Sequence, residues 1–172
     1  MAGAETLSPV LTAALEQRVC TVLEEARRRN LTLATAESCT GGLLASLLTD
    51  VEGRGHAFDR GFVVYTNEAK HEVLDIPASL LKDPGPVSGP TAIAMAQGLL
   101  EHSRADLCLA VTGFAGPSGP GDIPGLVFFA LATRRRATTL RREMFVPVDR
   151  GSVRIGSVRV ALEMLGAAIR QG

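Results

Sequence analysis

The run Leu107–Val111 (LCLAV) constrains the fold of this chain more than any other feature of its sequence. Every residue in it is apolar. Because successive side chains of a strand point to opposite faces of a sheet, such a run is typical of a strand that is buried on both faces. A strand of this kind needs helices on both sides of its sheet.

Helical and strand patterns alternate along the rest of the chain. Apolar residues at three- and four-residue steps predict helices, and short apolar runs bounded by small or polar residues predict strands. The predicted helices are residues 9–29, a segment beginning at 43, 67–76, 88–103 and 153–169. The predicted strands are residues 31–36, 61–66, 107–111, 125–133 and 138–146, the last two as an antiparallel hairpin. We therefore expect an α/β protein, a three-layer α/β/α sandwich with a mixed, mostly parallel sheet of about five strands.

Length and composition fit one soluble domain. The chain has 172 residues, of which 46% are hydrophobic and 21% charged. At this length, folding buries enough surface that the core needs no disulfide or metal to stabilise it. We expect a single domain over residues 1–172, with its core at about 9–170.

Charge, cysteine and hydrophobicity patterns exclude several classes of protein. The 18 basic and 18 acidic residues cancel, and no basic stripe with interleaved aromatic residues points to nucleic acid. No run approaches the roughly 20 apolar residues of a membrane helix, and Met1–Val10 lacks the basic and apolar regions of a secretory leader. The three cysteines form no CxxC pair, which suits a reducing compartment. We expect a cytoplasmic protein that binds neither nucleic acid nor membrane.

Two predicted strands end in turns made of small residues, Glu37–Gly42 (ESCTGG) and Thr112–Pro117 (TGFAGP). In open α/β sheets, ligands bind outside the carboxyl ends of the strands. Small residues there let backbone N–H groups converge and hold a phosphate or a developing oxyanion. The second turn opens the loop 112–125, and long loops in compact domains are commonly functional. Such turns also use glycine and serine for steric reasons alone, so the pattern leaves both interpretations open.

The scarcity of lysine draws attention to Lys70. Among the 18 basic residues only Lys70 and Lys82 are lysines. Lysine can lose its proton and act as a base, which arginine cannot. Tyr65, the only tyrosine, precedes Lys70 by five positions, and its hydroxyl could orient that amine or a substrate. An exposed helical lysine and an edge aromatic are the alternatives for these two residues.

The histidines give neither a catalytic triad nor a metal site. His56, His71 and His102 are separated in sequence, and none lies at HxH or HxxxH spacing with another ligand in a polar loop. A hydrolase built from these residues would use a serine nucleophile with a lysine base in preference to a Ser-His-Asp triad or zinc. We expect no metal and no organic cofactor.

Four strings in the same order resemble the CinA C-terminal domain family. They are AESCTGG at 36–42, GFVVYTNEAK at 61–70, Val87-Ser88, and TGFAGP at 112–117. The resemblance runs from about residue 12 to about residue 168. Standalone members of the family are nicotinamide-nucleotide amidases, so the resemblance implies hydrolysis of nicotinamide mononucleotide to nicotinate mononucleotide and ammonia, a step in pyridine nucleotide recycling.

The resemblance also implies residue roles. It makes Ser38 the nucleophile, Lys70 its base and Tyr65 the residue that assists the pair. An arginine near the start of the last helix would bind the substrate's phosphate, and Arg150 and Arg154 both match that pattern. The residues expected to line the substrate site are Cys39, Thr40, Gly41, Gly42, Thr112, Gly113, Arg150 and Arg154. The backbone N–H groups of Cys39 to Gly42 are the candidates for holding the oxyanion.

The chain departs from the family's pattern after Gly116-Pro117. Relatives commonly continue Asp-Gly-Gly and then Lys-Pro-Val-Gly-Thr-Val, whereas residues 118–127 read SGPGDIPGLV here. An amidase of other specificity is therefore an alternative. A second is a non-catalytic domain that senses nucleotides or binds a partner, because family names refer to competence and DNA damage. The N-terminal pyrophosphatase domain of longer relatives is not expected here, and a homo-oligomer is expected because small domains often complete such sites with a second subunit.

Overall fold

The computed structural model describes residues 12–51, 53, 55–116, 119, 121–146 and 149–171. Its elements follow in the order α1 (Ala13–Arg28), β1 (Leu33–Glu37), α2 (Leu43–Thr49), η1 (Gly55–Ala57), β2 (Phe58–Val63), α3 (Asn67–Leu74), α4 (Ala78–Lys82), α5 (Gly89–Glu101), β3 (Leu107–Gly113), β4 (Leu126–Thr133), β5 (Thr139–Met144) and α6 (Arg150–Gln171).

The five strands form one mixed sheet in the order β2-β1-β3-β4-β5. Strand β1 pairs in parallel with both β2 and β3, and β4 is antiparallel to both β3 and β5. Four strands therefore run in one direction and β4 opposes them, which confirms the predicted sheet. The apolar run at 107–111 lies in β3 at the centre of the sheet, buried throughout as predicted.

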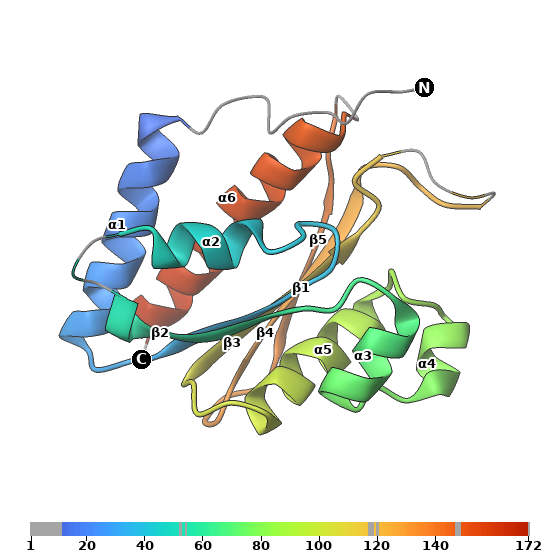
Figure 1. Cartoon of the computed structure of the whole chain (residues 1–172), viewed down its shortest axis with the longest axis horizontal. Coiled ribbons are helices and arrows are strands. Elements are labelled where there is room, and N and C mark those ends of the chain that lie inside the picture. Colours follow the sequence, from blue (N-terminus) through green and yellow to red (C-terminus); the bar gives the residue numbers. More distant parts are fainter. Residues whose placement is uncertain are drawn as a thin grey trace.

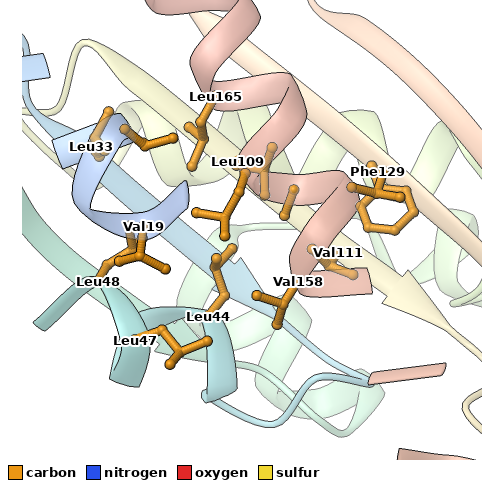
Figure 2. Packing of buried hydrophobic residues seen from close by; sticks show 14 of the residues in the cluster. Val19, Leu33, Leu44, Leu47, Leu48, Leu109, Val111, Phe129, Val158 and Leu165 are labelled. Carbon is orange, nitrogen blue, oxygen red and sulfur yellow. The ribbon is translucent and has the colours of Figure 1, made fainter. Parts of the chain in front are cut away.

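Two helical layers cover the sheet. Figure 1 shows α1, α2 and α6 on one face and α3, α4 and α5 on the other. The first layer encloses a large apolar cluster, and Figure 2 shows Leu44 and Val158 packing toward Leu109 and Val111 of β3. Alanine-rich strand faces and α5 form the second cluster, around Met95 and Leu99. The three-layer α/β/α sandwich is thus confirmed.

Several boundaries differ from the sequence predictions. The first helix begins at Ala13, capped by the Thr12 hydroxyl, and residues 9–11 of the predicted helix lie outside the described residues. The second strand is Phe58–Val63 instead of 61–66, because Thr66 is the N-cap of α3 and its side chain accepts a hydrogen bond from the Ala69 N–H. The short helix α4 was not predicted from the sequence. Within the described residues, no helix has the length and apolar character to cross a membrane.

A close approach between α5 and α3 depends on Gly98. A Cβ atom at this position would lie 2.3 Å from the carbonyl oxygen of Leu74, the last residue of α3. Backbone atoms cannot yield as a flexible side chain can, so only glycine allows the two helices to pack this closely. Since α3 also carries Lys70, Gly98 sets how deeply that lysine is buried.

We expect Gly98→Ala to destabilise the protein by about 1–3 kcal/mol, because the added methyl group pushes α3 away from α5. Helix propensity alone would predict the opposite sign, a gain of about 1 kcal/mol. The matched control is Gln97→Ala, at an exposed position of the same helix, which should stay within about 0.5 kcal/mol of the parent. Urea unfolding of the three proteins measures the difference, and an increased stability of Gly98→Ala would contradict the packing argument.

Candidate active site

Ser38 lies where two parallel strands end side by side. It follows Glu37, the last residue of β1, and its N–H donates to the carbonyl of Val111 in β3 at 3.0 Å. Only 7% of Ser38 is exposed. The sequence placed this serine at a carboxyl-terminal strand end, and the structure confirms that position.

The Glu37 carboxylate holds the turn that carries Ser38. It is buried, and it accepts hydrogen bonds from the N–H groups of Gly42 (3.1 Å), Leu44 (3.1 Å) and Ala45 (2.8 Å). The Thr35 hydroxyl adds a fourth contact at 3.3 Å. A helix begins with N–H groups that have no partner within the helix. Here one carboxylate accepts from three N–H groups at the start of α2, and the Leu43 N–H donates to the Thr40 carbonyl at 3.3 Å. The sequence analysis did not identify this role, although the glutamate precedes a Gly-Gly helix start.

Lys70 reaches Ser38 from the opposite helical layer. Its Nζ lies 3.2 Å from Ser38 Oγ and donates to the Tyr65 carbonyl at 3.0 Å. The residue is only 1% exposed and is among the largest fully buried side chains of the described chain. Two residues that are 32 positions apart in sequence thus meet in one buried contact.

Burial lowers the pKa of the Lys70 ammonium from its ordinary value of 10.5. The neutral amine is favoured because water is withdrawn from the charge, and both of its hydrogen-bond partners are neutral oxygens. A neutral amine beside a hydroxyl can accept the hydroxyl proton, which is what a serine nucleophile requires. Desolvation by the protein interior is the cause of this lowering of the pKa.

Tyr65 contacts the pair through its backbone. The predicted contact between its hydroxyl and Lys70 is wrong within the described residues, because the carbonyl accepts the lysine proton and 62% of the residue is exposed. A substrate contact for the side chain stays a prediction.

The backbone donors of the 38–42 turn are divided between two tasks. The Gly41 N–H donates to the Ser38 carbonyl at 3.1 Å and the Gly42 N–H to Glu37, so these two cannot hold an oxyanion as predicted. The N–H groups of Cys39 and Thr40 have no acceptor in another residue of the described chain. They are the two donors left for a developing negative charge next to Ser38.

The side chains of Cys39 and Thr40 point into the protein. Burial raises the pKa of the Cys39 thiol to about 12, so it stays protonated and is no competing nucleophile. Thr40 is fully buried, and its Oγ1 has no partner among the described residues. Cys39 and Thr40 were predicted to line the substrate site, and they can therefore contact a substrate only through their backbone groups.

The two candidate arginines have different surroundings. The Arg154 guanidinium donates twice to the Thr40 carbonyl, from Nη2 at 2.7 Å and from Nε at 3.2 Å. Gly41 has a φ of +61°, which favours glycine, and a Cβ there would lie in ordinary van der Waals contact with Arg154 Nη2, at 3.5 Å. Arg150 is the first residue of α6 and is exposed, with its Cβ 3.9 Å from where a Cβ of Gly116 would lie.

Thr112 and Gly113 are occupied by packing in this structure. The buried Thr112 hydroxyl donates to the Pro86 carbonyl at 2.8 Å, which ties the end of β3 to the loop before α5. A Cβ at Gly113 would lie 2.7 Å from a side-chain atom of Val127 on β4. Their predicted contact with substrate stays a prediction.

Two of the histidines have partners other than Ser38. His71 Nδ1 lies 2.8 Å from the Ile76 carbonyl and His102 Nε2 2.7 Å from Asp75, both away from the serine. Within the described ranges, no group of three or more metal-binding side chains gathers. A cavity of about 940 Å³, lined by Arg29, Arg135 and apolar residues such as Met164, lies at the other ends of the strands and does not include the Ser38–Lys70 pair.

The pKa of Lys70 predicts how stability depends on pH. Between the lowered pKa of the folded state and 10.5, the unfolded chain binds more protons at this residue, so its contribution makes stability rise with pH. Lys70→Met should remove that rise, and Lys82→Met, at an exposed position, should keep it. Urea unfolding at pH 7, 8.5 and 10 compares the slopes. Equal slopes in the parent and Lys70→Met would show that Lys70 titrates normally.

Comparisons with known proteins identify the family of the chain. The model of the CinA C-terminal domain matches residues 14–169. A putative competence-damage inducible protein of Symbiobacterium thermophilum is 46% identical over 160 residues, which are 88% of this chain and 37% of that protein. The nicotinamide-nucleotide amidohydrolase PncC of Escherichia coli K12 is 42% identical over 141 residues, which are 81% of this chain and 85% of that protein.

A solved structure shows the same fold. The competence/damage inducible protein CihA from Agrobacterium tumefaciens has a TM-score of 0.88 and 38% identity, over 94% of this chain and 98% of that one. The chain spans about a third of the length of several curated relatives, 37%, 29% and 33% in three of them. The family model nevertheless covers nearly all of the present sequence. The chain belongs to the CinA C-terminal domain family.

Proposed function

We propose that this protein hydrolyses the carboxamide of nicotinamide mononucleotide, releasing nicotinate mononucleotide and ammonia, with Ser38 as nucleophile and Lys70 as base. The observation that carries the proposal is the 3.2 Å contact between a buried, desolvated amine and the serine hydroxyl. The likeness to an amidohydrolase named for a nicotinamide nucleotide supports the substrate. In this proposal, residues 1–172 form one catalytic domain, and the protein acts in the cytoplasm.

The proposed reaction has two halves. Neutral Lys70 takes the Ser38 proton as Oγ attacks the carboxamide carbon, and the N–H groups of Cys39 and Thr40 stabilise the oxyanion. The lysine then gives its proton to the leaving nitrogen, so that ammonia departs and an acyl-serine ester remains. Water attacks that ester with Lys70 as base, and nicotinate mononucleotide leaves with the serine restored. No step requires a metal or an organic cofactor.

The two arginines divide the remaining tasks. Arg154 is a positioning residue, because both of its hydrogen bonds go to the Thr40 carbonyl and fix the peptide beside the nucleophile. Arg150 is exposed at the start of α6 beside the second glycine turn, where an incoming phosphate can reach it. We assign the phosphate contact to Arg150.

The first prediction from the proposed function concerns Ser38 and Lys70. Ser38→Ala and Lys70→Ala should each lower ammonia release from nicotinamide mononucleotide at least about a thousandfold, because each removes a group on which the other depends. Lys82→Ala, the other lysine, should retain full activity. The assay contains a chelator, and circular dichroism confirms folding.

No release by the parent protein would reject this substrate. A survey of other carboxamides would then distinguish an amidase of other specificity, which the divergent 117–127 loop keeps open, from a domain that only binds nucleotides.

A second prediction separates the two arginines. Arg150→Ala should raise the KM for nicotinamide mononucleotide by about tenfold to a hundredfold, yet leave turnover of nicotinamide riboside, which has no phosphate, unchanged. Arg154→Ala should lower kcat on both compounds, because it loosens the nucleophile turn. Steady-state kinetics on the two compounds gives KM and kcat for each variant. If Arg154→Ala raises KM for the mononucleotide alone and Arg150→Ala lowers kcat on both compounds, the phosphate contact belongs to Arg154.

A further inference from the structure

Strand β5 leaves one side of the sheet open. It is the last strand in the order and pairs only with β4 among the described residues. Its sequence is TLRREM, and its apolar residues Leu140 and Met144 are 46% and 45% exposed. An edge strand with exposed apolar residues is a template for another strand.

The hydrogen-bond pattern shows which residues of β5 face outward. The Leu126 carbonyl accepts a hydrogen bond from the Phe114 N–H, so the backbone groups of Leu126 point toward β3. The backbone groups of the next residue, Val127, therefore point toward β5, where Val127 is paired with Glu143. The Phe145 N–H also points inward, to Gly125 at 2.9 Å. Alternation along the strand then directs the N–H and C=O groups of Leu140, Arg142 and Met144 away from the sheet.

We propose that this edge binds a second copy of the same chain, with the two β5 strands antiparallel about a two-fold axis at Arg142. In that register Arg142 faces its own counterpart, and Leu140 faces Met144 of the second copy. All outward groups of both strands then pair, which gives about six new backbone hydrogen bonds. The two sheets join into one continuous sheet.

The side chains favour a copy of this chain over another partner. The same register sets Arg141 opposite Glu143 of the second copy, twice by symmetry, on the face where Arg141 already contacts Glu143 and Glu163 of its own chain. On the other face it sets Leu140 against Met144. Moving the axis by two residues to Leu140 would instead place Glu143 opposite Ala137 and Arg141 opposite Thr139, and the charge match would be lost.

One pairing opposes assembly. Arg142 and its counterpart carry like charges across the axis, which costs stability. Both side chains are exposed, so they can diverge into solvent and the cost stays small. This register therefore predicts that removing the Arg142 side chain strengthens the dimer, a result that a contact elsewhere on the surface would not give.

The test compares two substitutions at this one position. Arg142→Pro removes the outward N–H but no bond to β4, whereas Arg142→Ala keeps the N–H and removes only the like charge. We expect sedimentation equilibrium to show a dimer for the parent, a dimer of equal or higher affinity for Arg142→Ala, and a monomer for Arg142→Pro. A parent that is monomeric at high concentration, or an Arg142→Pro dimer as tight as the parent's, would overturn the proposal.

Disulfide formation tests the register and does not depend on how well the proline variant folds. In a Cys20→Ser background, Arg142→Cys should form a covalent dimer on oxidation, because opposed residues have Cα atoms about 5.5 Å apart. Leu140→Cys alone should not do so, and a mixture of Leu140→Cys with Met144→Cys should. Absence of the Arg142→Cys dimer would overturn the proposed axis. None of these outcomes depends on amidase activity, so a failure here leaves the proposed function intact.

Discussion

The carboxylate of Glu37 is the interaction on which the geometry of the site depends. A buried negative charge is costly unless donors surround it, and three backbone N–H groups at the start of α2 and one hydroxyl do so here. The carboxylate thereby fixes the short turn between β1 and α2. Ser38 is its first residue, so the direction of the hydroxyl follows from a charge buried one position earlier. Arg154 holds the same turn from α6 by its Thr40 carbonyl.

Burial of Lys70 adds a second constraint, which works against stability. An ammonium group in this position loses its hydration, and the protein lowers its pKa instead of pairing it with a carboxylate. The close contact of α3 with α5 at Gly98 and the Thr66 cap keep the helix, and therefore the lysine, in place. A lysine that costs stability in its charged form and is buried beside a serine hydroxyl is the trade-off expected of an active site.

The sequence predicted the layers because periodicity and turn residues are local signals. The central strand, the hairpin of β4 and β5 and the helix that became α5 were all visible in short windows. The meeting of Ser38 with Lys70 came from motif resemblance, and the parallel pairing of β1 with β2 explains it. The contact of Arg154 with Thr40 spans 114 residues and depends on how α6 crosses α2, which no local pattern encodes. The Glu37–Gly42 contact is local, five residues apart, but a glutamate before a Gly-Gly helix start does not by itself show that its side chain turns back to the helix N–H groups.

The strand order of the sheet separates the two proposed surfaces. Because β1, β2 and β3 are parallel, their carboxyl ends lie together, and the turns after β1 and β2 bring Ser38 and Lys70 into contact. The antiparallel β4 then carries the chain back, so β5 lies at the far edge, two strands beyond β3. Pairing of two β5 edges would leave the turn at Ser38 uncovered by the added sheet. The strand order thus puts the Ser38–Lys70 contact beside β1 and the unpaired edge of β5 on the opposite side of the sheet.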